Sequence, residues 1–314
     1  METHHLSGPA PGRFCEIIFR HRILSPELIR IASIELPAFD NLEQRRCYRV
    51  VVMTRRNLIA GVTASAIAGS TSQAAEGRGN NVYLEMKHYQ LHNSPEEQSN
   101  RLIDFLRDSY SGAVGRAGGK LIGGFTNHIG MEAPYVLVLT QYDGLGAFQT
   151  ALEKLAADSE YQHALATLNG GTGYPYLRVE SSLLKTFDGM PQPLLSDSSD
   201  THPSRYFELR RYESPTEVTL KQKVRMFNGG EIGVFQRLGM RPVFFGETVV
   251  GDHMPNLVYM LSFDDLPARE KLWKQFSGDP EWKKLSAPPE LHDEKIVSNI
   301  SNAILRPLGF SLIR

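Results

Sequence analysis

Two short segments of the chain carry the same order of side chains that could bind a ligand or transfer protons. The order is tyrosine, carboxylate, base and tyrosine at alternate positions. It occurs at Tyr83, Glu85, Lys87 and Tyr89, and again at Tyr206, Glu208, Arg210 and Tyr212. Side chains alternate between the two faces of a strand, so each set of four shares one face. An arginine beside a carboxylate and a phenol could hold a small molecule that carries a carboxylate or phenol group.

This pattern has two interpretations. In the first, the candidate ligand-binding residues are Glu208, Arg210 and Tyr212 with Glu85, Lys87 and Tyr89. In the second, the charged residues form a structural ion pair that closes the interface between two sheets, because structural ion pairs produce the same clusters as binding sites. The pattern assigns no catalytic residue.

The other side chains that could take part in chemistry predict neither a metal site nor a cofactor site. His88 and His92 lie four residues apart, but they straddle the end of a predicted strand, where such positions do not converge as on a helix. His128 and His253 precede predicted strands, and each is either solvated or a catalytic base. The glycine-rich stretch 115–124 follows a helix and enters a strand, the reverse of a phosphate-binding loop.

The two segments belong to an internal repeat. The strand pattern at 83–89 recurs at 206–212, 123 positions later, and 135–145 corresponds to 256–266 at an offset of 121. Tyr161 and Trp282 keep the offset of 121. Several matches in one order at nearly one offset indicate a tandem duplication.

Each copy is predicted to have the order β-α-β-β-α-β, which is the ferredoxin-like unit. For the first copy the predicted elements are strand 83–89, helix 97–117, strand 120–126, strand 134–142, helix 145–157 and strand 176–186. For the second copy they are strand 206–212, helix 219–237, strand 241–248, strand 256–263, helix 266–276 and strand 295–305. Gly118 and Gly239 follow the first helix of each copy and predict its end.

The alternation also predicts which face of each sheet meets the helices. Leu84 and Met86, with Phe207 and Leu209 in the second copy, form an apolar face that we expect to pack on the helices. The polar face that carries the six candidate residues would then remain open. Two open faces on one chain can meet and enclose a cavity lined by aromatic and charged groups.

The second copy resembles the NIPSNAP family domain. The resemblance rests on the segment 207–212, on 256–269 and on Asp279-Pro280-Glu281-Trp282, and the first copy is a degenerate version with Lys87 in place of the arginine. It implies the dimeric α+β barrel fold, here α+β with two tandem ferredoxin-like units forming one intramolecular barrel. That fold is similar to heme-degrading and antibiotic-biosynthesis monooxygenases. The family has proposed roles at vesicle or organelle surfaces and no settled catalytic residues.

The amino-terminal quarter has the layout of an export signal. Arg55 and Arg56 precede a weakly apolar stretch at 58–69, and Ser72-Gln73-Ala74 has the small residues of a cleavage site. The paired arginines and mild hydrophobicity resemble a twin-arginine signal. The alternative is a short amphipathic helix.

These features divide the chain as follows. We assign 1–52 to an over-extended or disordered N-terminus, 53–74 to the signal peptide, 82–188 to the first domain, 189–204 to a linker and 205–314 to the second domain. The start codon is Met1 or Met53. We expect a periplasmic or secreted bacterial protein, with a mitochondrial presequence as the alternative.

The amino-acid composition limits the classes of partner that we expect the protein to bind. The chain has 314 residues, 34 basic and 35 acidic side chains and a net charge of −1, which gives no reason to expect binding to nucleic acid. No apolar run is long enough for a stable membrane span. Both cysteines, Cys15 and Cys47, precede the predicted cleavage site, so the exported chain would have neither a disulfide nor a thiol nucleophile.

Three functions follow from this sequence. The first is an exported protein that binds a small molecule in a cavity between the two sheets. The second is an enzyme without a cofactor, similar to a monooxygenase or isomerase, that uses the same cavity. The third is a structural or interaction module without a ligand. A further copy of the chain is another possible partner.

Overall fold

The computed structural model describes residues 80–92, 98–197 and 205–314. All of them belong to one compact unit of the chain. The predicted N-terminal extension and export signal lie outside the described residues. Of the predicted linker, residues 189–197 are described, and they are fixed to the barrel: the Leu194 amide donates to the Val243 carbonyl at 2.8 Å.

The first repeat contains four strands and four α-helices among the described residues. The elements are β1 (Tyr83–Gln90), α1 (Gln98–Phe105), α2 (Ser111–Ala117), β2 (Lys120–Ile129), β3 (Tyr135–Tyr142), α3 (Leu145–Ala157), α4 (Ser159–Asn169) and β4 (Arg178–Thr186). The helix predicted at 97–117 is divided by a π-helical turn, Leu106–Tyr110. Gly118 ends it in the left-handed conformation, φ 98°, as predicted.

The second repeat follows the same order with one additional short helix. Its elements are β5 (Tyr206–Glu213), α5 (Glu217–Met226), α6 (Ile232–Leu238), β6 (Arg241–Val250), β7 (Asn256–Phe263), α7 (Leu266–Gly278), α8 (Pro280–Ser286), α9 (Asp293–Ile296) and β8 (Asn299–Pro307). A π-helical turn, Phe227–Glu231, again divides the first helix, 121 residues after its counterpart. Gly239 ends that helix with φ 80°.

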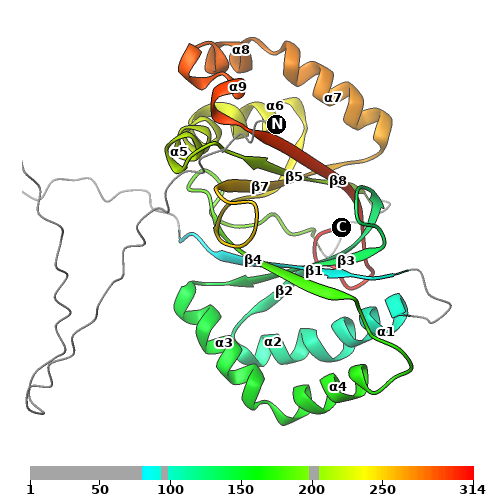
Figure 1. Cartoon of the computed structure of the whole chain (residues 1–314). Coiled ribbons are helices and arrows are strands. Elements are labelled where there is room, and N and C mark those ends of the chain that lie inside the picture. The colour runs from blue at the N-terminus through cyan, green and yellow to red at the C-terminus, as the bar shows by residue number, and fades with distance from the viewer. Residues whose placement is uncertain (1–79, 93–97, 198–204) are drawn as a thin grey trace, which may run out of the picture. The chain divides into compact units, whose positions relative to one another are not determined.

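The eight strands form one closed barrel in the order β1-β3-β2-β8-β5-β7-β6-β4. Each repeat contributes four neighbouring antiparallel strands, and the pairs β2–β8 and β4–β6 join the repeats. Figure 1 shows α1–α4 on one side of the strands and α5–α9 on the other. The predicted fold, α+β with two tandem ferredoxin-like units that form one intramolecular barrel, is confirmed.

The prediction of which strand face meets the helices is wrong. Leu84, Met86 and Phe207 belong to a buried cluster inside the barrel, and Leu209 packs against that cluster. The polar side chains of β1 and β5 instead lie under the helices. A closed barrel interior must be filled by side chains from both repeats, so the apolar faces turn inward. The helices bring charged and aromatic partners for the polar faces, as described below.

Two further apolar clusters lie between the sheet and the helices, one for each repeat. In the first, Leu102, Leu106 and Val114 from the first helix pack on Val136 and Val138 of β3. In the second, Phe227, Phe235 and Phe276 pack on Phe245 and Tyr259. The barrel is thus held by three cores, one inside it and two outside.

Among the described residues, no helix has both the length and the apolar character needed to cross a membrane.

Candidate functional site

The three candidate residues of the second repeat form a buried network between β5 and the helices. Glu208 is fully buried. Its carboxylate accepts hydrogen bonds from the Arg269 Nε and from the Trp273 Nε1, both at 2.8 Å, and from the Arg210 Nη1 at 2.8 Å. Burial alone would raise the pKa of Glu208, but the donation by Arg269 and the charge of Arg210 hold it below its usual value. Glu208 is therefore an ionised hub that joins strand and helix.

Arg210 and Tyr212 extend this network. The Arg210 guanidinium stacks 4.6 Å from the Trp273 ring centroid and donates to the Tyr212 hydroxyl at 3.2 Å. That hydroxyl also accepts from Tyr259 at 3.0 Å. The side chains of this sequence-predicted site are thus brought together, but against helix α7 and not in a cavity between two sheets.

The first repeat has a smaller version of the same network. Lys87 lies 3.1 Å from the Glu85 carboxylate, which also accepts from the Tyr142 hydroxyl. Tyr89 packs edge-on against Tyr176. The hydroxyl of Tyr110, at the end of the π-helical turn, lies 3.4 Å from the Lys87 Nζ. The ion pair that recurs in both repeats lies within one strand, between Glu85 and Lys87 in β1 and between Glu208 and Arg210 in β5. Tyr110 in the first repeat, and Arg269 and Trp273 in the second, connect this pair to the helices, so it does not join sheet to sheet.

A pocket of about 370 Å³ lies at one end of the barrel. None of the six predicted residues lines it. The lining residues are Met86, His88, Met131, Glu132, Leu137, Glu180, Ser182, Leu209, Arg211, Glu213, Asp252, His253, Asn299 and Ser301. Its volume falls in the range of small-molecule sites.

Equivalent positions of the two repeats face each other across this pocket. The strand registers make His88 the counterpart of Arg211 and Met86 the counterpart of Leu209. Met86, Leu137 and Leu209 supply apolar surface that continues into the barrel core. The polar side chains come from the strand ends and from the β2–β3 and β6–β7 loops. The pocket is therefore a joint product of both repeats.

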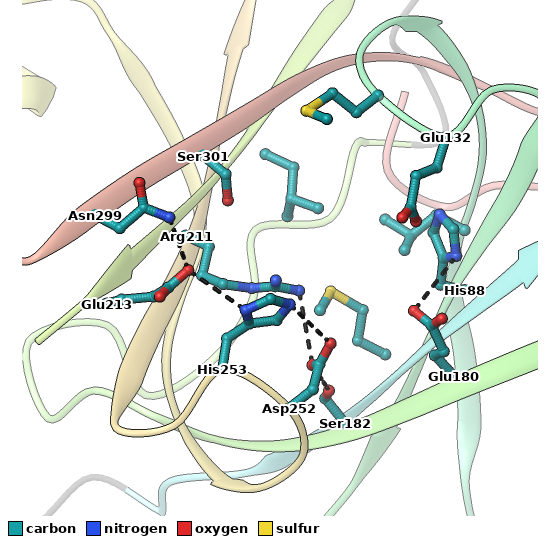
Figure 2. Close-up of a pocket in the computed structure, with 14 residues that line it drawn as sticks. His88, Glu132, Glu180, Ser182, Arg211, Glu213, Asp252, His253, Asn299 and Ser301 are labelled. Atoms are coloured by element: carbon teal, nitrogen blue, oxygen red, sulfur yellow. Dashed lines mark hydrogen bonds and ion pairs between the residues drawn. The ribbon is translucent and has the colours of Figure 1, made fainter. Parts of the chain in front are cut away.

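One side of the pocket is a cluster around His253 (Figure 2). The His253 Nδ1 lies 3.6 Å from Glu213, and its Nε2 lies 3.3 Å from Asp252. Asp252 also lies 3.8 Å from the Arg211 Nη2, and Glu213 accepts from the Asn299 amide at 3.0 Å. His253 is 51% exposed, so this cluster is open to solvent.

The other side of the pocket is built around His88. Its Nδ1 lies 4.0 Å from the Glu180 carboxylate, beyond hydrogen-bond distance. Its ring packs 4.2 Å from the ring of Tyr135. Burial lowers the pKa of His88, against the pull of Glu180 and Glu132, so the ring is neutral at pH 7. Arg178 forms ion pairs with Glu180 at 2.6 Å and with Glu132 at 3.3 Å.

The lining is rich in carboxylates. It carries Glu132, Glu180, Glu213 and Asp252 against the single guanidinium of Arg211. Among the described residues, no cluster of histidine, cysteine or carboxylate side chains is arranged to hold a metal ion. This arrangement can accept hydrogen bonds from a ligand or compensate a positive charge on it.

The sequence pattern of β1 and β5 carries a signal for the pocket. The inward positions of β1 read Leu84, Met86 and His88, and those of β5 read Phe207, Leu209 and Arg211. The apolar face thus becomes polar at the carboxyl end of each strand. Polar residues at the end of an otherwise apolar inward face indicate the mouth of a barrel. Of the two histidines for which the sequence allows a role as catalytic base, His253 lines the pocket and His128 does not.

The chain resembles several solved structures. An anthrone oxidase-like protein is 13% identical, with a TM-score of 0.44, and the match covers 74% of this chain and 93% of that one. A NIPSNAP family protein from Agrobacterium tumefaciens is 17% identical, with a TM-score of 0.33, covering 38% of this chain and all of that one. A NIPSNAP-like domain protein from Burkholderia xenovorans is 20% identical, with a TM-score of 0.31, covering 34% and 88%.

Among proteins with curated descriptions, none matches the chain significantly. The family comparison is positive twice: residues 85–172 and residues 207–312 both match the domain described as NIPSNAP. These two matches cover more than half of the chain, and one lies in each half of the barrel. The chain belongs to the NIPSNAP family and carries two copies of its domain in tandem.

Proposed function

We propose that the protein binds a small molecule in the pocket at the end of the barrel, and that this ligand has an apolar body and a positively charged group. The observation that carries the proposal is the composition of the lining, with apolar side chains beside four carboxylates and one guanidinium. Apolar surface with a few polar groups that fix orientation is typical of ligand sites.

Charge favours a cation over an anion. Arg211 is already engaged with Asp252, and Arg178 neutralises part of the charge on Glu180 and Glu132. An ammonium group could replace the exposed histidine as the partner of Glu213 and Asp252. A carboxylate ligand would face these groups without a free arginine in the lining. This ligand class differs from the one expected from Arg210, because Arg210 does not line the pocket.

Matched ligands test the proposal. We would measure the melting temperature with 2-phenylethylamine, 2-phenylethanol and phenylacetate, which share an aromatic body and differ in charge. The amine should stabilise the protein most and phenylacetate least, since a ligand at 100 times its Kd adds about 2.7 kcal/mol.

Variants locate the binding site. Asp252→Asn should weaken stabilisation by the amine. Glu247→Gln is the matched control, because Glu247 pairs with Lys221 outside the pocket. Equal effects of the three compounds, or an amine effect that Asp252→Asn leaves intact, would contradict the proposal.

A further inference from the structure

We propose that His88 is a general base in this pocket, which takes a proton from carbon on a bound ligand while Glu180 positions its ring. The inference rests on the proposed function, because the ligand must first occupy the pocket. It adds an activity, proton transfer at carbon, to what would otherwise be a binding site.

One ring nitrogen of His88 lacks a hydrogen-bond partner among the described residues. The His88 Nδ1 is buried and has no hydrogen-bond partner among the described residues. Buried polar atoms almost always have such a partner, so an exception calls for an explanation. Glu180 lies 4.0 Å away, and a movement of about 1 Å would close a hydrogen bond between them. With the Nδ1 proton directed at Glu180, the Nε2 lone pair of the neutral ring is the proton acceptor.

Charged groups of both signs surround the His88 ring. Glu180 and Glu132 stabilise a proton on His88, whereas burial, Arg178 and Arg211 oppose it. Figure 2 shows His88 with both carboxylates on the same side of the pocket. The ring is therefore without its extra proton at rest, and carboxylates are in place to compensate the charge once it arrives. A general base needs both properties.

Neither of the other two basic side chains in the lining, Arg211 and His253, can take this role in the same way. Arg211 occupies the position of His88 in the second repeat, and a guanidinium does not accept a proton in proteins. His253 is half exposed and already lies between two carboxylates. The duplication thus leaves one partly buried neutral base on one side of the pocket.

The chemistry that fits is an isomerisation of a carbon acid. The imidazole takes a proton from carbon next to an electron-withdrawing group, and the electron pair of the C–H bond stays on the substrate. The protonated ring then returns the proton to another carbon. Atoms and electrons balance within the substrate and His88, so no oxidant or co-reactant is needed.

The probe 5-nitrobenzisoxazole tests the base directly. A base removes its ring C–H proton, the electron pair forms a nitrile, and the N–O bond breaks to release a coloured phenolate. We expect saturable turnover at least about tenfold faster than with the same concentration of free imidazole, and we expect this turnover to fall at pH below 6.5.

His88→Gln should remove this turnover. His163→Gln, an exposed position on α4, should keep it. Glu180→Gln should lower kcat more than it changes KM and shift the pH midpoint.

A second measurement separates failure of this proposal from failure of the binding function. Diethyl pyrocarbonate reacts with neutral imidazole: the ring nitrogen attacks a carbonyl carbon, and carbon dioxide and ethanol are released. Peptide mass mapping should find His88 modified, with a pH midpoint below 6.5. Turnover that survives His88→Gln, or saturable probe binding without turnover, would overturn the proposal and leave binding intact. If the probe neither saturates nor raises the melting temperature, the pocket does not admit it. In that case the mass mapping alone tests the proposal. If His163 is modified and His88 is not, the proposal that His88 is a general base is overturned.

Discussion

Glu132 and His253 occupy the same position in the two halves of the chain, and both adopt a left-handed backbone conformation at the rim of one pocket. Their φ angles are 60° and 53°. Both side chains line the pocket. Residues other than glycine rarely adopt this region, which costs them roughly 1–2 kcal/mol. The strained geometry is shared by both repeats, although the two side chains differ in charge, so the loop shape and not the residue type is the common feature.

This relationship predicts how the stability of the protein depends on the residue at position 132. Glu132→Gly should leave the free energy of unfolding unchanged or raise it by up to about 1 kcal/mol, because glycine adopts a positive φ without strain. Glu132→Val should lower it by about 1–2 kcal/mol. Urea unfolding of both variants measures the difference. Equal stability of the glycine and valine variants would contradict the prediction.

The Glu208 network predicts a large loss of stability when one partner is removed. Arg269→Met should lower the free energy of unfolding by about 3 kcal/mol, because it leaves a fully buried carboxylate short of a cation. Chemical unfolding at pH 7 measures the loss. The control is Arg107→Met, at an exposed arginine that pairs with Asp104 and Asp108, where a much smaller change is expected. A loss at Arg269 no larger than at Arg107 would show that the network does not hold α7 to the sheet.

Repetition and alternation predicted the order of the elements, and the resemblance to the NIPSNAP domain implied the barrel, but neither gave the direction of the strand faces. Alternation at Glu208 and Leu209 says that two faces differ; it does not say which one is inside. That choice depends on partners distant in sequence. Arg269 and Trp273, more than 60 residues later, satisfy Glu208 under the helices. Phe125 from the first repeat meets Phe207 inside the barrel.

The pocket was harder to predict for the same reason. Glu180 and His88 are 92 residues apart and meet only through the pairing of β4 with β1. Asp252 and Glu213 come together only where the β6–β7 loop approaches the end of β5. No local spacing carries this information, although polar residues at the inward ends of β1 and β5 indicated where the barrel opens.

The export signal is a prediction that can be tested separately from the barrel. We propose that Arg55 and Arg56 direct the chain to the twin-arginine route. Replacing both by lysine should abolish secretion in the native host while the level inside the cell is maintained, as measured by fractionation and immunoblotting. Arg78→Lys is the control, because Arg78 follows the predicted cleavage site and is present whether translation starts at Met1 or at Met53. Unchanged secretion of the variant with lysine at positions 55 and 56 would contradict the proposal.

Stability should depend on pH through His88. Burial holds the pKa of His88 in the folded protein below its ordinary value of 6.5. The unfolded chain therefore takes up a proton first as the pH falls, and protons that bind only the unfolded state destabilise the fold. The stability that the neutral ring contributes is thus present above pH 6.5 and is lost as the pH falls toward the folded-state pKa.

The difference in unfolding free energy between wild type and His88→Gln should be constant at high pH and should shift against the wild type below pH 6.5. The shift should be about 1.4 kcal/mol for each unit by which the pKa is lowered. His163→Gln controls for the loss of a histidine, and a difference that moves in favour of the wild type at low pH would mean that His88 gains its proton on folding.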